Sequence, residues 1–193
     1  MDLNTPPRTL AFAKIRKTIF GAVLVNSGNA NCATKTGDKV AINSTRALAK
    51  LLKLQPNQVL PASTGVIGVE LDEQLILSKL PELVEKLSDT ALPDVARAIC
   101  TTDLQPKAAS REVTLRRGIV RIAGVTKGSG MIHPRMATTL GFVMTDAVIP
   151  QTLLRRMLLR ATELSYNRIS VDGDTSTNDT IIVLANGASA VRP

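Results

Sequence analysis

The chain has 193 residues, of which 44 % are hydrophobic and 21 % charged, an ordinary balance for a folded globular protein. Aromatic residues make up only 2 %, so the core must be built from Leu, Val, Ile and Ala. No apolar run approaches the roughly 20 residues that span a bilayer. The N-terminus lacks a secretory signal pattern, so we expect a cytoplasmic protein without a membrane partner.

The formal net charge of +8 could attract nucleic acid, an anionic membrane or acidic small substrates. The basic residues are scattered, with short pairs such as Arg116–Arg117 and Arg155–Arg156. Few aromatic side chains are available to stack on bases, which argues against a nucleic-acid partner. We interpret the charge mostly as solvated surface, with one or two residues that bind a carboxylate. A nucleic-acid-binding module is the weaker alternative, which a steep salt dependence of binding would support.

The two cysteines, Cys32 and Cys100, form no CxxC pair, and His133 is the single histidine. A metal site built from Cys and His is therefore not expected. We interpret both cysteines as buried, reduced thiols.

In the first third of the chain, residues 19–25 form an apolar run that leads into an Asn/Gly/Ser loop, a pattern that predicts a strand and a turn. Residues 43–54 have apolar residues at helical spacing, and Asn43 or Ser44 is the predicted N-cap. Residues 59–68 then predict a short strand that runs into a glycine-bearing loop.

The middle of the chain predicts two further helical segments. Asp72 is the predicted cap of a helix over residues 73–80. Pro81 interrupts the pattern, and residues 82–87 resume it with proline at a first-turn position. Residues 95–103 predict a short helix or strand that leads into a polar loop.

The last third alternates strands and helices. Val113–Val125 alternate as in a β-hairpin with its turn near Arg117 and Gly118. A strand over 139–144, an amphipathic helix over 152–165 and a strand over 180–187 follow. The whole pattern indicates a mixed arrangement of helices and strands in layers. Because the chain stops directly after a strand, we expect the sheet to continue in a further part or a partner chain.

The dipeptide Ala137–Thr138 lies between a glycine-rich loop and an apolar strand. The plain interpretation is a turn that leads into the strand. A chemical alternative is a peptide bond that is cut, so that Thr138 becomes an N-terminus whose own α-amino group accepts the hydroxyl proton. That amine has a reference pKa of about 7.7–8.0, which suits acid–base work near neutrality. A small residue before the nucleophile, and Gly128 and Gly130 nearby, favour a close approach.

Two further loops offer polar groups. Ser63–Gly68 could present backbone N–H groups and the Thr64 hydroxyl to a developing oxyanion, although a tight turn is the simpler interpretation. Lys127 lies in a glycine loop and could hold a substrate carboxylate as a point charge, although most loop lysines face water. The loop is not GxxxxGK[ST], so a phosphate cradle is not supported.

Five motifs together resemble the ornithine acetyltransferase family, also called glutamate N-acetyltransferase, of the arginine pathway. Their order and spacing resemble the central portion of the family chain. The motifs are VNSGNAN (25–31), PASTGVIG (61–68), CTTD (100–103), TKGSGMIHPRMAT (126–138) and SVDGDTSTNDT (170–180).

The resemblance implies a role for each matching residue. Members of the family cut themselves at an Ala–Thr bond, which corresponds to Ala137–Thr138 and makes Thr138 the nucleophile. Thr64 and Gly65 match the oxyanion-stabilising pair, and Lys127 matches the substrate-binding lysine. The substrate-binding threonine falls in CTTD, where we choose Thr101 over Thr102.

The implied reaction is ping-pong acetyl transfer through an acetyl-threonine. Thr138 takes the acetyl group from N2-acetylornithine, and glutamate then removes it to give N-acetylglutamate. The resemblance implies no cofactor and no metal, although some members also accept acetyl-coenzyme A. The implied fold is α+β, a layered αββα sandwich, and the implied assembly contains two α and two β pieces (α2β2).

Family chains are longer than this one. We therefore expect residues 1–193 to form a single domain that is an incomplete part of a longer fold, with 1–137 as the α piece and 138–193 as the start of the β piece. The alternative is a catalytically incomplete fragment with a structural or binding role. Three tempting residues receive plain interpretations: His133 as non-catalytic, and Asp172 and Asp174 as turn-forming rather than as part of a calcium loop.

Overall fold

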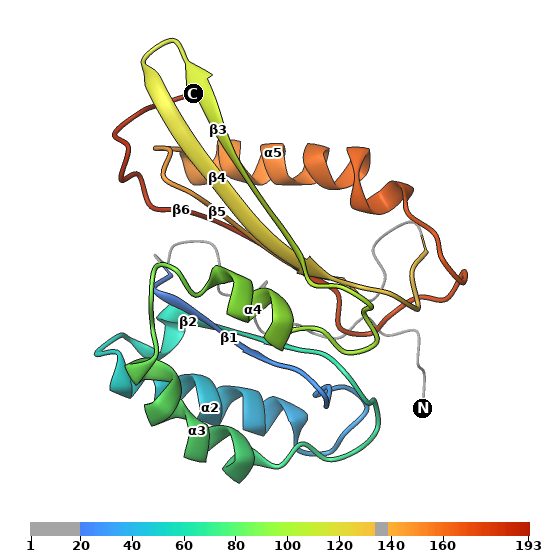
Figure 1. Cartoon of the computed structure of the whole chain (residues 1–193). Helices are drawn as coiled ribbons and strands as arrows, with labels where there is room; N and C mark the ends of the chain where they lie inside the picture. Colours follow the sequence, from blue (N-terminus) through green and yellow to red (C-terminus); the bar gives the residue numbers. More distant parts are fainter. Residues whose placement is uncertain (1–19, 134–138) are drawn as a thin grey trace. The chain divides into compact units, whose positions relative to one another are not determined.

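The structure is a computed structural model that describes residues 20–133 and 139–193. The chain divides into two compact units, Met1–Ala91 and Leu92–Pro193, and each is described here by itself (Figure 1). Both units combine helices with a β-sheet, so the predicted α+β class is confirmed.

Unit 1 places two helices beside a pair of parallel strands (Figure 1). Strands β1 and β2 run in register from Ala22↔Val59 to Asn26↔Ser63. The core forms where helices α2 and α3 bring Leu48, Ala49 and Leu80 against Val59 of β2. The elements of unit 1 are β1 (Ala22–Asn26), α2 (Gly37–Leu51), η1 (Pro56–Gln58), β2 (Val59–Ser63) and α3 (Glu73–Glu85).

Two details of the predicted helices in unit 1 were wrong. Helix α2 begins at Gly37, because the buried face already includes Val40, so Asn43 and Ser44 lie inside the helix instead of capping it. Helix α3 is capped by Asp72 as predicted, since its carboxylate accepts a 2.9 Å hydrogen bond from Gln74 N. It then continues through Pro81 to Glu85 instead of being interrupted there, and Leu80 is buried in the core.

Unit 2 is built on a four-stranded sheet in the order β3-β4-β5-β6. The first two pairs are antiparallel, and the last pair is parallel. The predicted hairpin is confirmed, with its turn at residues 116–117. The elements of unit 2 are α4 (Leu92–Ala98), β3 (Lys107–Leu115), β4 (Gly118–Lys127), β5 (Leu140–Thr145), α5 (Gln151–Leu164), η2 (Tyr166–Arg168) and β6 (Thr180–Ala185).

The strand register in unit 2 brings three strand ends to one edge of the sheet. Lys127, the last residue of β4, pairs with Leu140, the first residue of β5. Leu140 in turn pairs with Thr180, the first residue of β6. The segments that leave β4 and enter β5 and β6 therefore lie next to one another, and this edge positions the candidate site.

The predicted amphipathic helix is confirmed as α5. Its predicted apolar face is partly open, because Met157 and Leu164 are 45 % and 56 % exposed. After the helix, Tyr166 covers β5 so closely that a Cβ on Gly141 would lie 3.0 Å from the tyrosine hydroxyl. Across the described parts of both units, no helix combines the length and the apolarity needed to cross a membrane.

Candidate active site

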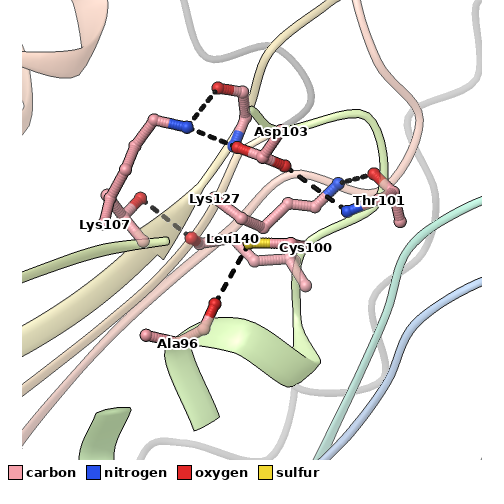
Figure 2. Close-up of polar contacts among 9 residues, drawn as sticks. Ala96, Cys100, Thr101, Asp103, Lys107, Lys127 and Leu140 are labelled. Carbon is pink, nitrogen blue, oxygen red and sulfur yellow. Dashed lines mark hydrogen bonds and ion pairs between the residues drawn. The ribbon is translucent and has the colours of Figure 1, made fainter. Parts of the chain in front are cut away.

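The end of β4 carries a lysine that is almost fully buried. Lys127 is 2 % exposed, and its ammonium donates a 2.8 Å hydrogen bond to Oγ1 of Thr101 (Figure 2). Burial lowers the pKa of Lys127 below its ordinary value, while the negative charge of Asp103 opposes that shift. Burying a cation costs free energy, and an anion bound beside it offsets that cost. The arrangement therefore suits the recognition of a carboxylate.

A buried carboxylate fixes the chain directly after Lys127. Asp103, whose side chain has no exposed surface, accepts a 2.8 Å hydrogen bond from Gly128 N and an ion-paired contact from Lys107 (Figure 2). The Lys107 ammonium also donates to Gly128 O at 3.1 Å. Burial would raise the pKa of Asp103, but the hydrogen bonds from Lys107 and Gly128 outweigh it and hold that pKa below its usual value. Both polar groups of Gly128 are thus held by side chains.

The CTTD motif is brought to Lys127 by the loop after α4. Thr101, the predicted substrate-binding residue, is exposed at the surface, yet its hydroxyl meets the buried ammonium. The preceding residue, Cys100, donates from its thiol to Ala96 O in α4 at 3.1 Å (Figure 2). Cys32 and Cys100 are both free thiols, but they are half-buried rather than buried as predicted.

The predicted scissile bond, Ala137–Thr138, lies outside the described residues. The structure does describe the chain on either side of it, and the loop before β6 contacts both flanks. Asp172 accepts hydrogen bonds from Met131 N and Ile132 N at 2.5 and 2.9 Å. Asp179 accepts one from Thr139 N at 2.6 Å.

The two aspartates that hold these flanks differ in electrostatics. The hydrogen bond from Met131 N keeps the pKa of Asp172 below its usual value. Burial raises the pKa of Asp179 to about 6, although the hydrogen bond from Thr139 N and the charge of Lys127 act in the opposite direction. The sequence pattern predicts a turn-forming role for Asp172 and assigns no role to Asp179. An acidic residue placed directly before an apolar strand was the available signal.

Asp174, the other candidate in this loop, contributes a backbone N–H to Asp172 at 3.2 Å. Among residues 20–133 and 139–193, no group of three or more His, Cys, Asp or Glu side chains is arranged to hold a metal ion.

The predicted oxyanion pair lies in unit 1, where the loops after β1 and β2 interlock. Thr64 N donates to Asn26 O at 3.1 Å, and Val66 N donates to Gly28 O at 3.2 Å. Thr64 is buried, with 4 % of its surface exposed.

Position 65 accepts only glycine. Gly65 has a φ of +126°, and a Cβ there would lie 2.3 Å from the carbonyl carbon of Gly28. Ser63 reinforces the contact between the two loops, since its hydroxyl donates to Asn31 Oδ1 at 2.7 Å and accepts from Asn31 N at 3.1 Å. The backbone around Thr64 and Gly65 is therefore held rigidly, as an oxyanion-binding loop requires.

The pair Arg116–Arg117 lies at the other end of β4 from Lys127. A shallow hollow of about 430 Å³ occurs there, lined by Leu115, Arg116, Arg117, Arg192 and Pro193. Its lining contains no aromatic ring on which a base could stack.

Comparison with known proteins gives a consistent family. A model described as the ArgJ family matches residues 4–193. The chain is 49 % identical over 169 residues to the arginine biosynthesis bifunctional protein ArgJ 1 of a Nostoc species, covering 87 % of this chain and 41 % of that protein. It is 47 % identical over 173 residues to a Synechococcus ArgJ, covering 89 % and 42 %. The chain thus spans about two fifths of the length of these curated relatives.

Two solved structures share the fold. A Bacillus halodurans arginine biosynthesis bifunctional protein ArgJ superimposes with a TM-score of 0.52 at 34 % identity, covering 60 % of this chain and 61 % of that one. An ornithine acetyltransferase from Mycobacterium tuberculosis, solved in complex with ornithine, gives a TM-score of 0.52 at 28 % identity, covering 58 % and 61 %.

Proposed function

The chain belongs to the ArgJ family, and on this premise we propose that it carries the catalytic segment of an acetyltransferase of arginine biosynthesis. The proposed reaction moves the acetyl group of N2-acetylornithine to glutamate through an acetyl-threonine at Thr138. The proposed reaction uses no cofactor, and acetyl-coenzyme A is proposed as a second acetyl donor.

One observation carries the proposal. The buried ammonium of Lys127 is held by Thr101 at the edge of the sheet where β5 begins, and Lys127 pairs directly with Leu140. Leu140 follows Thr138 by two residues in the sequence. A carboxylate-binding cation and the start of the strand that follows the proposed nucleophile thus occupy adjacent strands.

Self-cleavage is the first proposed step. The Thr138 hydroxyl attacks the carbonyl carbon of Ala137, the peptide C–N bond breaks, and the nitrogen takes the hydroxyl proton. Water then hydrolyses the resulting ester, which leaves a carboxylate on Ala137 and a free α-amino group and hydroxyl on Thr138. Residues 1–137 become the α piece, and residues 138–193 become the start of the β piece.

Acetyl transfer follows on the same hydroxyl. The α-amino group accepts the Thr138 hydroxyl proton as the oxygen attacks the acetyl carbon, and the proton then leaves with the amine of ornithine. Glutamate attacks the acetyl ester and restores the hydroxyl. The Thr64 hydroxyl and Gly65 N–H donate to the developing oxyanion, where loss of one donor typically costs about 2.7–4 kcal/mol in the barrier.

Lys127 and Thr101 have a binding role in this scheme. Both substrates carry an α-carboxylate, which the Lys127 ammonium can bind as a point charge. The Thr101 hydroxyl accepts from that ammonium, so its own O–H can be donated to the same carboxylate. The pair therefore recognises the part that donor and acceptor substrates share.

A second candidate function rests on coverage. The chain spans about two fifths of the length of its curated relatives, and this second candidate is a catalytically incomplete fragment with a structural or binding role. The proposed assembly of the active form is α2β2, and the proposed location is the cytoplasm.

The two candidates are separated by assaying the purified 193-residue chain. The enzyme proposal predicts N-acetylglutamate from N2-acetylornithine and glutamate, and its loss in Thr138→Ala. Absence of transfer, together with unchanged binding of ornithine in Thr138→Ala, would support the fragment instead.

A further inference from the structure

Thr139 is tied on both sides to the entry of β6. Its N–H donates to Asp179 Oδ1 at 2.6 Å, and its carbonyl accepts from Thr180 N at 2.9 Å. Thr139 is itself buried, and the register places the next residue, Leu140, opposite Thr180. The backbone at position 139 therefore has little freedom.

We propose that Asp179 is a positioning residue for the proposed nucleophile, acting through the backbone N–H of Thr139. The inference rests on the proposed function of Thr138. The N–H that Asp179 holds belongs to the peptide bond joining residues 138 and 139, and a peptide bond is planar. Holding this N–H therefore restrains the chain at the residue directly after the proposed nucleophile.

A carboxylate in this half-buried position has a cost that a neutral acceptor would not have. A neutral acceptor, such as an asparagine amide, would satisfy one backbone N–H without placing a charge in a half-buried position. Burial here disfavours the ionised form of Asp179 and raises its pKa to about 6. Perturbed pKa values cluster at functional sites. The hydrogen bond to Thr139 N and the choice of an ionisable side chain at position 179 therefore both support a functional role for Asp179.

Two groups oppose the effect of burial on the charge state of Asp179. The Thr139 N–H donates to it directly, and the Lys127 ammonium acts from β4. Both favour the ionised carboxylate. Asp179 therefore also places a negative charge near the proposed carboxylate-binding lysine, so loss of that charge alters the electrostatics of the site as well as its geometry.

The first test measures the rate of self-cleavage of the full 193-residue chain. Asp179→Ala removes acceptor and charge, and we expect a rate about 10- to 100-fold lower, as for loss of one hydrogen bond to a charged group. Asp179→Asn keeps an acceptor oxygen, so we expect a smaller loss and no step in the pH–rate profile near pH 6. Asp174→Ala, an exposed aspartate in the same loop, is the matched control and should cleave at the wild-type rate.

The second test does not depend on cleavage. In the Thr138→Ala chain, the NMR signal of the Thr139 amide should titrate with a midpoint near pH 6, and Asp179→Asn should abolish that titration. Wild-type cleavage rates in Asp179→Ala, or a Thr139 amide indifferent to pH and to Asp179→Asn, would overturn the inference. A wild-type chain that transfers acetyl groups but stays uncut, with a normal amide titration, would instead remove the proposed function.

Discussion

The Lys127 ammonium donates a 2.8 Å hydrogen bond to the Thr101 hydroxyl, and this contact joins the last residue of β4 to the loop after α4. It connects two motifs that lie 26 residues apart in the sequence. Of the two threonines in CTTD, Thr101 is the one whose hydroxyl meets Lys127 in this contact.

The choice between the two threonines gives a matched pair of variants. Thr101→Val keeps the shape but removes the hydroxyl that meets Lys127, so we expect KM for N2-acetylornithine and glutamate to rise about 10- to 100-fold, the loss of one hydrogen bond to a charged group. Thr102→Val should leave KM near the wild-type value. Steady-state kinetics on both variants decides, and a larger effect from Thr102→Val would contradict the assignment.

The lowered pKa of Lys127 predicts a pH dependence of substrate binding. Only the ammonium form attracts a carboxylate, so binding should weaken as pH rises through the Lys127 pKa, which burial places below the ordinary lysine range. The measurement is kcat/KM against pH on the alkaline side. In Lys127→Met that alkaline limb should disappear together with most of the affinity, and a limb that persists would assign it to another group.

Asp103 is predicted to stabilise the fold in a pH-dependent way. Asp103→Ala leaves the Gly128 N–H without its partner, which should cost about 1–3 kcal/mol of unfolding free energy. The folded-state pKa of Asp103 is depressed, so its contribution is present above the unfolded pKa of about 3.9 and is lost as pH falls further. Urea unfolding at pH 7 and pH 3 measures this: the variant should differ from the wild type less at pH 3.

Asp179 should have the opposite linkage. Its folded-state pKa of about 6 lies above the unfolded value, so the native state binds the extra proton and stability falls as pH rises between about 4 and 6. Asp179→Asn should therefore raise Tm at pH 7.5 even though it impairs the proposed cleavage. A lower Tm at that pH would show that the charge stabilises the fold.

Two glycines in one loop separate backbone strain from steric overlap. Gly68 has a φ of +79° with open space around its Cβ position, so Gly68→Ala should cost only the left-handed penalty of about 1–2 kcal/mol. Gly65→Ala adds overlap with Gly28 and should cost more, with a larger loss of acetyl transfer. Denaturant unfolding of both variants is the check, and equal costs would contradict the tight packing of the two loops.

Much of the fold could be predicted from local patterns. The hairpin around residues 116–117, the helix capped by Asp72 and the strand before Gly65 each have a clear periodicity or turn signal within a few residues. The first residue of α2 and the face of α2 that is buried could not be predicted from local patterns. They depend on Val40 and Leu48 being buried by other elements, which is tertiary information.

The residues of the candidate site fall into two groups, those predicted from sequence motifs and those identified only from the structure. Lys127, Thr101 and the pair Thr64–Gly65 were identified through the resemblance of their motifs, and the contact between Lys127 and Thr101 agrees with a shared task. Asp103 and Asp179 were not assigned roles, because their partners lie 25 and 40 residues away in the sequence. Only strand register brings such pairs together.

Intact-mass spectrometry of the freshly purified, denatured chain tests the central claim most directly. We expect two pieces, residues 1–137 and 138–193, with one acetyl group added to the second piece after brief exposure to N2-acetylornithine, and a single uncut chain in Thr138→Ala. An uncut wild-type chain that still transfers acetyl groups, or a Thr138→Ala chain that is cut at the same bond, would contradict it.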